Sequence, residues 1–303
     1  MRALVISGGG SKGAFAGGVA QHLIEDKGRQ YDIFIGSSTG SLLIPHLALN
    51  KIETIRRAYT SVNQNSIFNI NPFIINGDDS KGWSIKINHL NVVSQFFKKK
   101  KTFGESLNLR KLIANTFTKE DFDLLKDSGK EIVVTVSNLT LNSIEYKSIK
   151  DYDYEEFCDW IWISCNVVPF MSLITKHDCE YADGGFGSMV PIEEAIQRGA
   201  TVVDVIVLEM ENKLIEQLPT KNVFSLLTNL NLYMMERVSK QNIRLGKFVA
   251  NNSGAILNFY FTPTALTPNA LIFNKKNMCQ WWEMGIQYAK SKDPSCGEIR
   301  HGQ

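Results

Sequence analysis

The chain has 303 residues, 44% of them hydrophobic and 21% charged, and 33 basic against 31 acidic side chains leave a formal net charge of +2. This composition is typical of a soluble globular protein: the near-zero charge argues against nucleic-acid binding, and no apolar run approaches the roughly 18 residues that a membrane-spanning helix needs. The five cysteines are odd in number and lack C-x-x-C spacing, which favours reduced thiols over a disulfide framework or a zinc site.

A strand, a glycine-rich loop and a helix are predicted at the start of the chain. Residues 2–7 form a β-branched, apolar run typical of a strand, and residues 14–25 carry apolar side chains at helical spacing. The loop between them, residues 8–13, matches the G-x-G-x-x-G pattern of dinucleotide-binding proteins, and its backbone N–H groups suit an oxyanion as well as a phosphate. Lys12 and the glycines interrupt the apolar run that a signal peptide needs, so we expect a mature cytoplasmic start.

A second strand, tight turn and helix follow directly. The apolar residues 31–35 predict the strand, and residues 41–49 have the length and content of a helix. Between them, Gly36, Ser38 and Gly40 have the G-x-S-x-G spacing of a nucleophile elbow, in which a serine sits on a sharp turn that only small neighbours allow. Ser38 is therefore the candidate nucleophile, and a glycine-bracketed turn without chemistry is the alternative.

Strands and helices alternate through the rest of the chain. The predicted strands cover residues 131–138, 143–147, 201–208 and 256–262, and the predicted helices cover residues 107–116, 154–165, 191–198, 223–245 and 276–289. This alternation predicts an α/β fold with a mainly parallel central sheet and helices on both faces. Residues 61–101 are the least regular and predict an insertion or lid. We expect one domain over residues 1–291, with a core at 1–210, a helical part at 211–291 and a polar tail at 292–303.

Candidates for a general base are few. None of the five histidines lies in a recognisable catalytic setting. Asp183 stands out instead, because an acid followed by Gly184 and Gly185 predicts a tight, exposed loop that can bring a carboxylate against another segment of the chain. The same pattern is also typical of an ordinary turn.

Three motifs, taken together and in this order, resemble those of the patatin-like phospholipase family. They are the glycine loop at residues 8–13, the pentad at 36–40 and the D-G-G sequence at 183–185, preceded by a small-residue and proline segment at 164–170. The resemblance is specific over residues 1–210 and thin beyond them. It implies a three-layer α/β/α fold and a lipid acyl hydrolase of the phospholipase A or lysophospholipase type.

The resemblance also implies a role for each motif. Ser38 is the nucleophile and Asp183 the base of a Ser-Asp dyad that uses no histidine, no metal and no cofactor. The backbone amides of Gly9, Gly10 and Ser11 form the oxyanion hole. The residues that support these motifs are Gly8, Lys12, Gly13, Gly36, Gly40, Gly184 and Gly185. Such a site permits acyl transfer in two steps, with attack on an ester carbonyl followed by release of the acyl group to water.

The expected substrate is a phospholipid or another acyl-ester lipid, and no nucleic-acid partner is expected. The expected location is the cytoplasm. Residues 96–101 (FFKKKK) favour a solvated loop, with peripheral contact to an anionic membrane left open, and a homodimer is also left open. Two other functions also stay open. One is an α/β-hydrolase esterase with a Ser-Asp-His triad that uses His177 or His301, although only 37 residues precede Ser38, which is short for that fold. The other is a nucleotide-binding module built on the G-x-G-x-x-G loop.

Two helices near the C-terminus are predicted to be amphipathic. In residues 223–245, one stripe favours core packing over an interfacial lid, and its members are Phe224, Leu227, Leu230, Met234 and Val238. The last helix carries an apolar face that includes Trp281 and Trp282. We expect that face to dock on the body of the domain or on a second copy of the chain.

Overall fold

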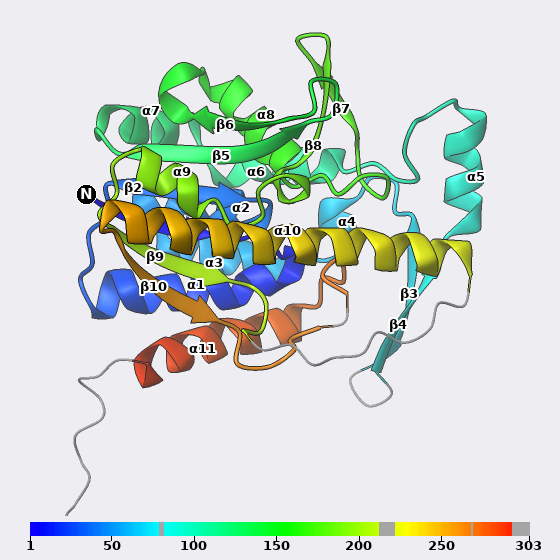
Figure 1. Cartoon of the computed structure of the whole chain (residues 1–303). Helices are drawn as coiled ribbons and strands as arrows, with labels where there is room; N and C mark the ends of the chain where they lie inside the picture. The colour runs from blue at the N-terminus through cyan, green and yellow to red at the C-terminus, as the bar shows by residue number, and fades with distance from the viewer. Residues whose placement is uncertain (79–81, 212–221, 268, 293–303) are drawn as a thin grey trace, which may run out of the picture.

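The chain is represented by a computed structural model, which describes residues 1–78, 82–211, 222–267 and 269–292. Its main sheet contains β1 (Arg2–Ile6), β2 (Ile33–Ser37), β5 (Glu131–Asn138), β6 (Ser143–Ser148), β7 (Ile174–Lys176), β8 (Cys179–Asp183), β9 (Val202–Val207) and β10 (Ile256–Phe261). The strand order is β10-β9-β1-β2-β5-β8-β7, with β6 also paired to β5 (Figure 1). The strands from β10 to β5 in this order run parallel, whereas β6 and β8 are antiparallel to β5 and β7 is antiparallel to β8.

Both faces of the sheet are covered by helices, because the inner strand β1 is apolar at successive positions. In β1, Leu4 and Ile6 belong to one buried cluster, and Ala3 and Val5 belong to another. Successive side chains of a strand point to opposite faces, so such a strand requires cover on both sides. The predicted α/β fold, mainly parallel and flanked by helices on both faces, is confirmed.

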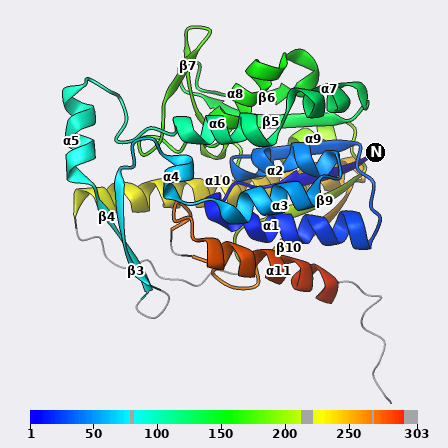
Figure 2. The same ribbon diagram turned by 180° about the vertical axis from the view of Figure 1, so that it is seen from behind.

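The helices divide between the two clusters. The larger cluster is built with α1 (Gly13–Gln21), α2 (Thr39–Ala48), α3 (Ile52–Ser61), α6 (Leu107–Thr116), α7 (Lys119–Asp127), α8 (Tyr154–Ser164) and α11 (Lys275–Ser291). The smaller cluster is built with α9 (Ile192–Gln197) and α10 (Val223–Ser253). Figure 1 shows α10 crossing in front of the sheet, and Figure 2 shows α1, α2, α3 and α11 on the opposite face. Short helical turns are η1 (Gly10–Lys12), η2 (His22–Asp26), η3 (Ile149–Asp151) and η4 (Gly184–Phe186).

The C-terminal helices only partly follow the predictions. Trp282 of α11 is fully buried, and its Nε1 donates a hydrogen bond to Gln21 of α1 at 2.8 Å, which confirms that α11 docks on the body of the domain. In α10, the prediction that the apolar stripe packs in the core is wrong for Leu230 and Met234, whose side chains are about half exposed. The predicted polar tail lies outside the described residues apart from Lys292. In the described part of the chain, no helix is long and apolar enough to cross a membrane.

Residues 61–101 are more regular than predicted. They contain α4 (Gln64–Ile67), the hairpin of β3 (Phe73–Asp78) and β4 (Gly82–Ile87), and α5 (His89–Phe97). Two of the asparagines that make the sequence look irregular are helix caps: Asn63 accepts hydrogen bonds from the first turn of α4, and Asn88 accepts one from Asn91 in α5. In both views this segment lies at the end of the molecule toward which the parallel strands point (Figures 1 and 2).

Candidate active site

The sheet brings Ser38 and Asp183 together although 145 positions separate them. Strand β2 pairs with β5 as far as Ser37 opposite Thr135, and β8 pairs with the next stretch of β5, beginning with Asp183 opposite Val136. Because β6 pairs with these same residues of β5, β2 and β8 share the remaining edge of that strand. The parallel strand β2 and the antiparallel strand β8 therefore meet end to end, and the residues at their ends become neighbours.

Ser38 sits on a sharp turn between β2 and α2. Its backbone has φ 51° and ψ −122°, a conformation that is costly for a residue with a side chain. The surrounding backbone is equally tight, since a Cβ atom on Gly40 would lie 2.2 Å from the carbonyl oxygen of Ile6. Gly36 likewise packs against Gly40. This geometry is the one expected of a nucleophile elbow.

Asp183 accepts a hydrogen bond from Ser38. The distance from Ser38 Oγ to Asp183 Oδ2 is 2.6 Å, and the Gly185 amide donates to Asp183 Oδ1 at 2.7 Å. Asp183 is completely buried, and this burial raises the pKa of its carboxyl to about 7 although both hydrogen bonds lower it. The predicted exposed loop is wrong: Gly184 and Gly185 are buried in η4, where Gly184 packs against the Thr135 backbone.

The glycine loop after β1 lies beside Ser38. A Cβ atom on Gly8 would be 3.0 Å from the Cβ of Ser38, so the two backbones are in close contact. Among the described residues, no hydrogen-bond acceptor is found for the amides of Gly9 and Gly10. The Ser11 amide, in contrast, donates to the Ala270 carbonyl at 2.8 Å. The expectation that Ser11 contributes an oxyanion donor is therefore corrected, because a distant loop already takes its N–H.

The other residues of the loop support its conformation. The Lys12 ammonium donates to the Leu208 carbonyl at 2.6 Å, which ties the loop to the end of β9. Gly13 is the first residue of α1. A Cβ atom on Gly13 would lie 2.4 Å from the hydroxyl oxygens of Thr39 and Tyr59, so only glycine fits at this position. The loop is thus fixed against both neighbouring strand ends.

The small-residue segment at 164–170 holds both strand ends. Ser164 Oγ accepts a hydrogen bond from the Ser38 amide at 2.9 Å, and the Cys165 thiol donates to the Ser38 carbonyl at 3.1 Å. The Asn166 carbonyl accepts from the Asp183 amide at 2.9 Å. The sequence identified residues 164–170 as a segment of the family pattern, but it did not predict which of these residues contact Ser38 and Asp183.

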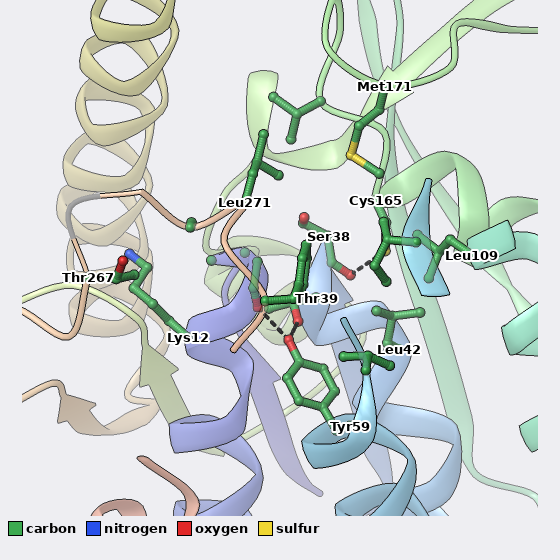
Figure 3. Close-up of a pocket in the computed structure, with 18 of the residues that line it drawn as sticks. Lys12, Ser38, Thr39, Leu42, Tyr59, Leu109, Cys165, Met171, Thr267 and Leu271 are labelled. Carbon is green, nitrogen blue, oxygen red and sulfur yellow. Dashed lines mark hydrogen bonds between the residues drawn. The ribbon is translucent and has the colours of Figure 1, made fainter. Parts of the chain in front are cut away.

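Tyr59 was also missed by the sequence analysis. It lies in α3, an element that the pattern did not predict, and its side chain is buried. Its hydroxyl donates to the carbonyl oxygen of Gly10 and is hydrogen-bonded to the hydroxyl of Thr39 (Figure 3). Burial raises the pKa of Tyr59, so the hydroxyl keeps its proton. The residue therefore links the glycine loop directly to the first turn after Ser38.

Ser38 opens into a cavity of about 660 Å³, which is within the usual range for small-molecule sites. Leu42 and Leu109 lie on one side of Ser38, and Lys12 and Thr267 lie on the other (Figure 3). The apolar side is formed by α2, α3 and α6, and further aliphatic and aromatic side chains there are Pro45, Ile55, Val62, Ile67, Leu112, Ile113 and Phe117. The cavity thus joins an apolar chamber to a more polar rim at the serine.

None of the histidines in the described part of the chain takes part in the contact between Ser38 and Asp183. His46 lines the cavity, but its Nε2 lies 3.0 Å from the Thr116 carbonyl, and burial lowers its pKa. His177 is mostly exposed and lies 3.5 Å from Glu156, while His301 lies outside the described residues. Among the described residues, no three His, Cys, Asp or Glu side chains are grouped so as to hold a metal ion.

Comparisons with known proteins place the chain in a family. The family model described as patatin-like phospholipase matches residues 4–196, which is more than half of the chain. A search of curated proteins finds no match. Among solved structures, VipD from Legionella pneumophila is 15% identical, with a TM-score of 0.49 and coverage of 96% of this chain and 67% of its own. The chain therefore belongs to the patatin-like phospholipase family, a family of lipid acyl hydrolases.

Proposed function

We propose that this chain is a metal-independent serine hydrolase that cleaves acyl esters of phospholipids through a dyad of Ser38 and Asp183. The observation that carries the proposal is the 2.6 Å hydrogen bond from Ser38 Oγ, on a strained turn, to a carboxylate that is completely buried. Strain and burial at a polar pair both cost stability, and they are typical of catalytic sites.

In the first step, Ser38 Oγ attacks the ester carbonyl carbon while Asp183 takes the hydroxyl proton. An ordinary aspartate is a weak base, but burial raises the pKa of Asp183 to about 7, which suits proton transfer near neutral pH. The amides of Gly9 and Gly10 would donate to the oxyanion of the tetrahedral intermediate. Collapse of that intermediate breaks the ester C–O bond, and Asp183 returns its proton to the departing alcohol oxygen.

In the second step, water attacks the acyl-serine. Asp183 accepts a proton from this water, and the resulting oxyanion again uses the two glycine amides. Breakage of the bond from the acyl carbon to Ser38 Oγ releases the free acid, and the proton on Asp183 restores the serine hydroxyl. Ester and water thus become alcohol and carboxylic acid without any metal or redox cofactor.

The shape of the cavity supports a lipid as substrate. The side formed by α2, α3 and α6 presents aliphatic and aromatic residues, such as Leu42 and Leu109, next to the nucleophile. An acyl chain in this chamber would remove apolar surface from water on both partners, which favours binding by about 25 cal/mol per Å². The scissile carbonyl would then lie at Ser38, with the alcohol part of the ester toward Lys12.

Product analysis tests the proposed reaction. Wild-type protein is incubated with mixed membrane phospholipids without added metal and with a chelator present, and the lipids are analysed by mass spectrometry. We expect free fatty acids and the matching lysophospholipids, both absent with Ser38→Ala. Phosphorylated head groups or diacylglycerol as the products would instead indicate cleavage at phosphorus and contradict the proposal.

The rate of ester hydrolysis should depend on the ionisation of Asp183. Because burial raises the pKa of this carboxyl to about 7, the base is protonated and inactive at lower pH. We expect kcat/KM for a water-soluble, non-ionising ester to rise about tenfold per pH unit below 7 and to level off above it. A pH-stat titration of the released acid measures this profile. A profile that stays flat from about pH 5 to 8 would show that Asp183 is not the base.

Removal of the Tyr59 hydroxyl should weaken catalysis through the glycine loop. In Tyr59→Phe the Gly10 carbonyl loses its donor, so the loop amides are less well fixed at the oxyanion position. We expect kcat for a soluble ester to fall about 10- to 100-fold with little change in KM, because misplaced donors act mainly on the transition state. Tyr31→Phe is the matched control, since Tyr31 is also buried, its hydroxyl donates to Asp204 Oδ2 at 2.7 Å, and neither residue lines the cavity. Equal kcat values in the two variants would contradict a positioning role for Tyr59.

A further inference from the structure

Helix α5 has its apolar side chains on the outside. Leu90 is 85% exposed, and Phe96 and Phe97 are each 79% exposed, whereas the polar Gln95 is buried. A surface helix normally shows the opposite arrangement, with apolar residues toward the core and polar residues toward water. Clustered large apolar side chains in water mark an interaction surface.

The first half of α10 continues this apolar surface. Val223 is 77% exposed, and Leu226 and Leu230 are each about half exposed. Phe224 connects the two helices, because its ring centroid lies 6.1 Å from that of His89 in α5 and 5.5 Å from that of Phe103. Both views place α5 beside the start of α10, at the end of the molecule toward which the parallel strands point (Figures 1 and 2).

Helix α10 also forms part of the cavity that holds Ser38. Leu232 and Met235 line this cavity, whereas Leu226 and Leu230 face solvent. At 3.6 residues per turn, these two pairs fall on opposite sides of the helix. One helix therefore separates the cavity from the exposed apolar surface.

The apolar surface is bordered by positive charge. Residues 98–101 are four consecutive lysines that follow Phe97 at the end of α5. Lys100 pairs with Glu105 at 2.9 Å and Lys101 pairs with Glu180, but Lys98 and Lys99 are exposed and have no acidic partner among the described residues. Exposed aromatic side chains beside unpaired lysines match the chemistry of an anionic lipid surface, which offers hydrocarbon next to phosphate.

We propose that α5 and the first half of α10 form a docking face for an anionic lipid bilayer. The docking face consists of Leu90, Phe96, Phe97, Val223, Leu226 and Leu230, with Lys98 and Lys99 at its border. The apolar side chains enter the interface while the lysines contact lipid phosphates. Because α10 has the cavity on its other side, docking brings Ser38 close to lipid that leaves the bilayer.

This inference rests on the proposed function, because a bilayer is where an acyl-ester lipid is found, and its test therefore separates binding from catalysis. Binding is measured by flotation with vesicles of phosphatidylcholine alone and of equal parts phosphatidylcholine and phosphatidylglycerol. All proteins carry Ser38→Ala in this assay, so that vesicles stay intact. Hydrolysis of a short water-soluble ester is measured with the same variants in the Ser38 background.

Two double variants test the two parts of the docking face. Phe96→Ser with Phe97→Ser should lower partition onto both vesicle types at least about tenfold, since two exposed aromatic rings no longer enter the interface. Lys98→Glu with Lys99→Glu should lower partition at least about tenfold on the anionic vesicles alone. Leu139→Ser with Leu141→Ser, on the exposed turn between β5 and β6, is the matched control and should bind as the parent does. Hydrolysis of the soluble ester should be unchanged in all three.

Two results would overturn the proposal. One is equal flotation of the parent protein and the phenylalanine variant. The other is a parent protein that elutes as a dimer and a phenylalanine variant that elutes as a monomer in size-exclusion chromatography, which would show that the docking face binds a second copy. Flotation of the Ser38→Ala parent together with no ester hydrolysis by the protein that keeps Ser38 would leave the docking face intact and count against the proposed function.

Discussion

Replacement of Ser38 by alanine is expected to lower kcat/KM for ester hydrolysis about 10⁴-fold or more. The substitution removes the oxygen that forms the acyl intermediate, and the remaining glycine amides and cavity can only bind the substrate. The fold should survive, because alanine keeps the backbone hydrogen bonds of Ser38 to Ser164 and Cys165. Loss of the side-chain hydrogen bond leaves the buried Oδ2 of Asp183 without its donor, which costs about 1–3 kcal/mol of unfolding free energy. Initial rates with a soluble ester and a thermal melt measure the two effects.

The neighbouring residue provides a matched control for this substitution. Ser37 is also buried, but its hydroxyl has no hydrogen-bond partner among the described residues. Ser37→Ala should therefore keep the wild-type rate and react with a fluorophosphonate probe, whereas Ser38→Ala should not react. Labelling of Ser38→Ala together with retained hydrolysis would assign the nucleophile to another serine.

The sheet and its helices were largely predictable because their patterns are local. Strand β5 matches its predicted bounds, since residues 132–136 (IVVTV) form an unbroken run of β-branched side chains. Helix α10 was predicted to end at residue 245 but continues to Ser253. Gly246, directly after the predicted end, lies inside α10 and lets the helix pack closely on Ile192, because a Cβ atom on Gly246 would lie 2.6 Å from the Cβ of Ile192. The helix ends instead at Gly254, whose φ of 74° is the left-handed conformation in which a glycine commonly caps a helix.

The candidate site shows the same division between local and tertiary information. The motifs place Ser38 and Asp183 on loops, and the meeting of β2 and β8 on one edge of β5 places the two side chains in contact. In contrast, the Ser11 amide is not free to donate to an oxyanion, because it already donates to the carbonyl of Ala270. Ala270 lies beyond the part of the chain that the motifs cover, so the motifs could not reveal this contact. Tyr59 was not predicted for a similar reason, because its contact with Gly10 arises only when α3 packs under the loop.

The burial of Asp183 is the property that the sequence could least reveal. It raises the pKa of the proposed base and it lowers the stability of the folded protein, and a single substitution can separate these two effects. The folded protein holds a proton on Asp183 up to a pKa of about 7, whereas the unfolded chain releases it near the ordinary value of 3.8. The folded state therefore binds more protons between these values, so the free energy of unfolding falls as the pH rises toward 7. Above pH 7 the full cost of the buried charge is present.

Asp183→Asn is therefore expected to lower activity and raise stability. Asparagine can still accept a hydrogen bond from the Gly185 amide, but it cannot take a proton from Ser38, so we expect kcat/KM to fall about 10³-fold or more. The free energy of unfolding should rise by about 1–4 kcal/mol at about pH 8, and this gain should disappear as the pH falls to about 4. Urea titrations of both proteins at several pH values measure the difference. A variant that is less stable than the wild type at about pH 8 would mean that hydrogen bonds outweigh the desolvation of the carboxylate.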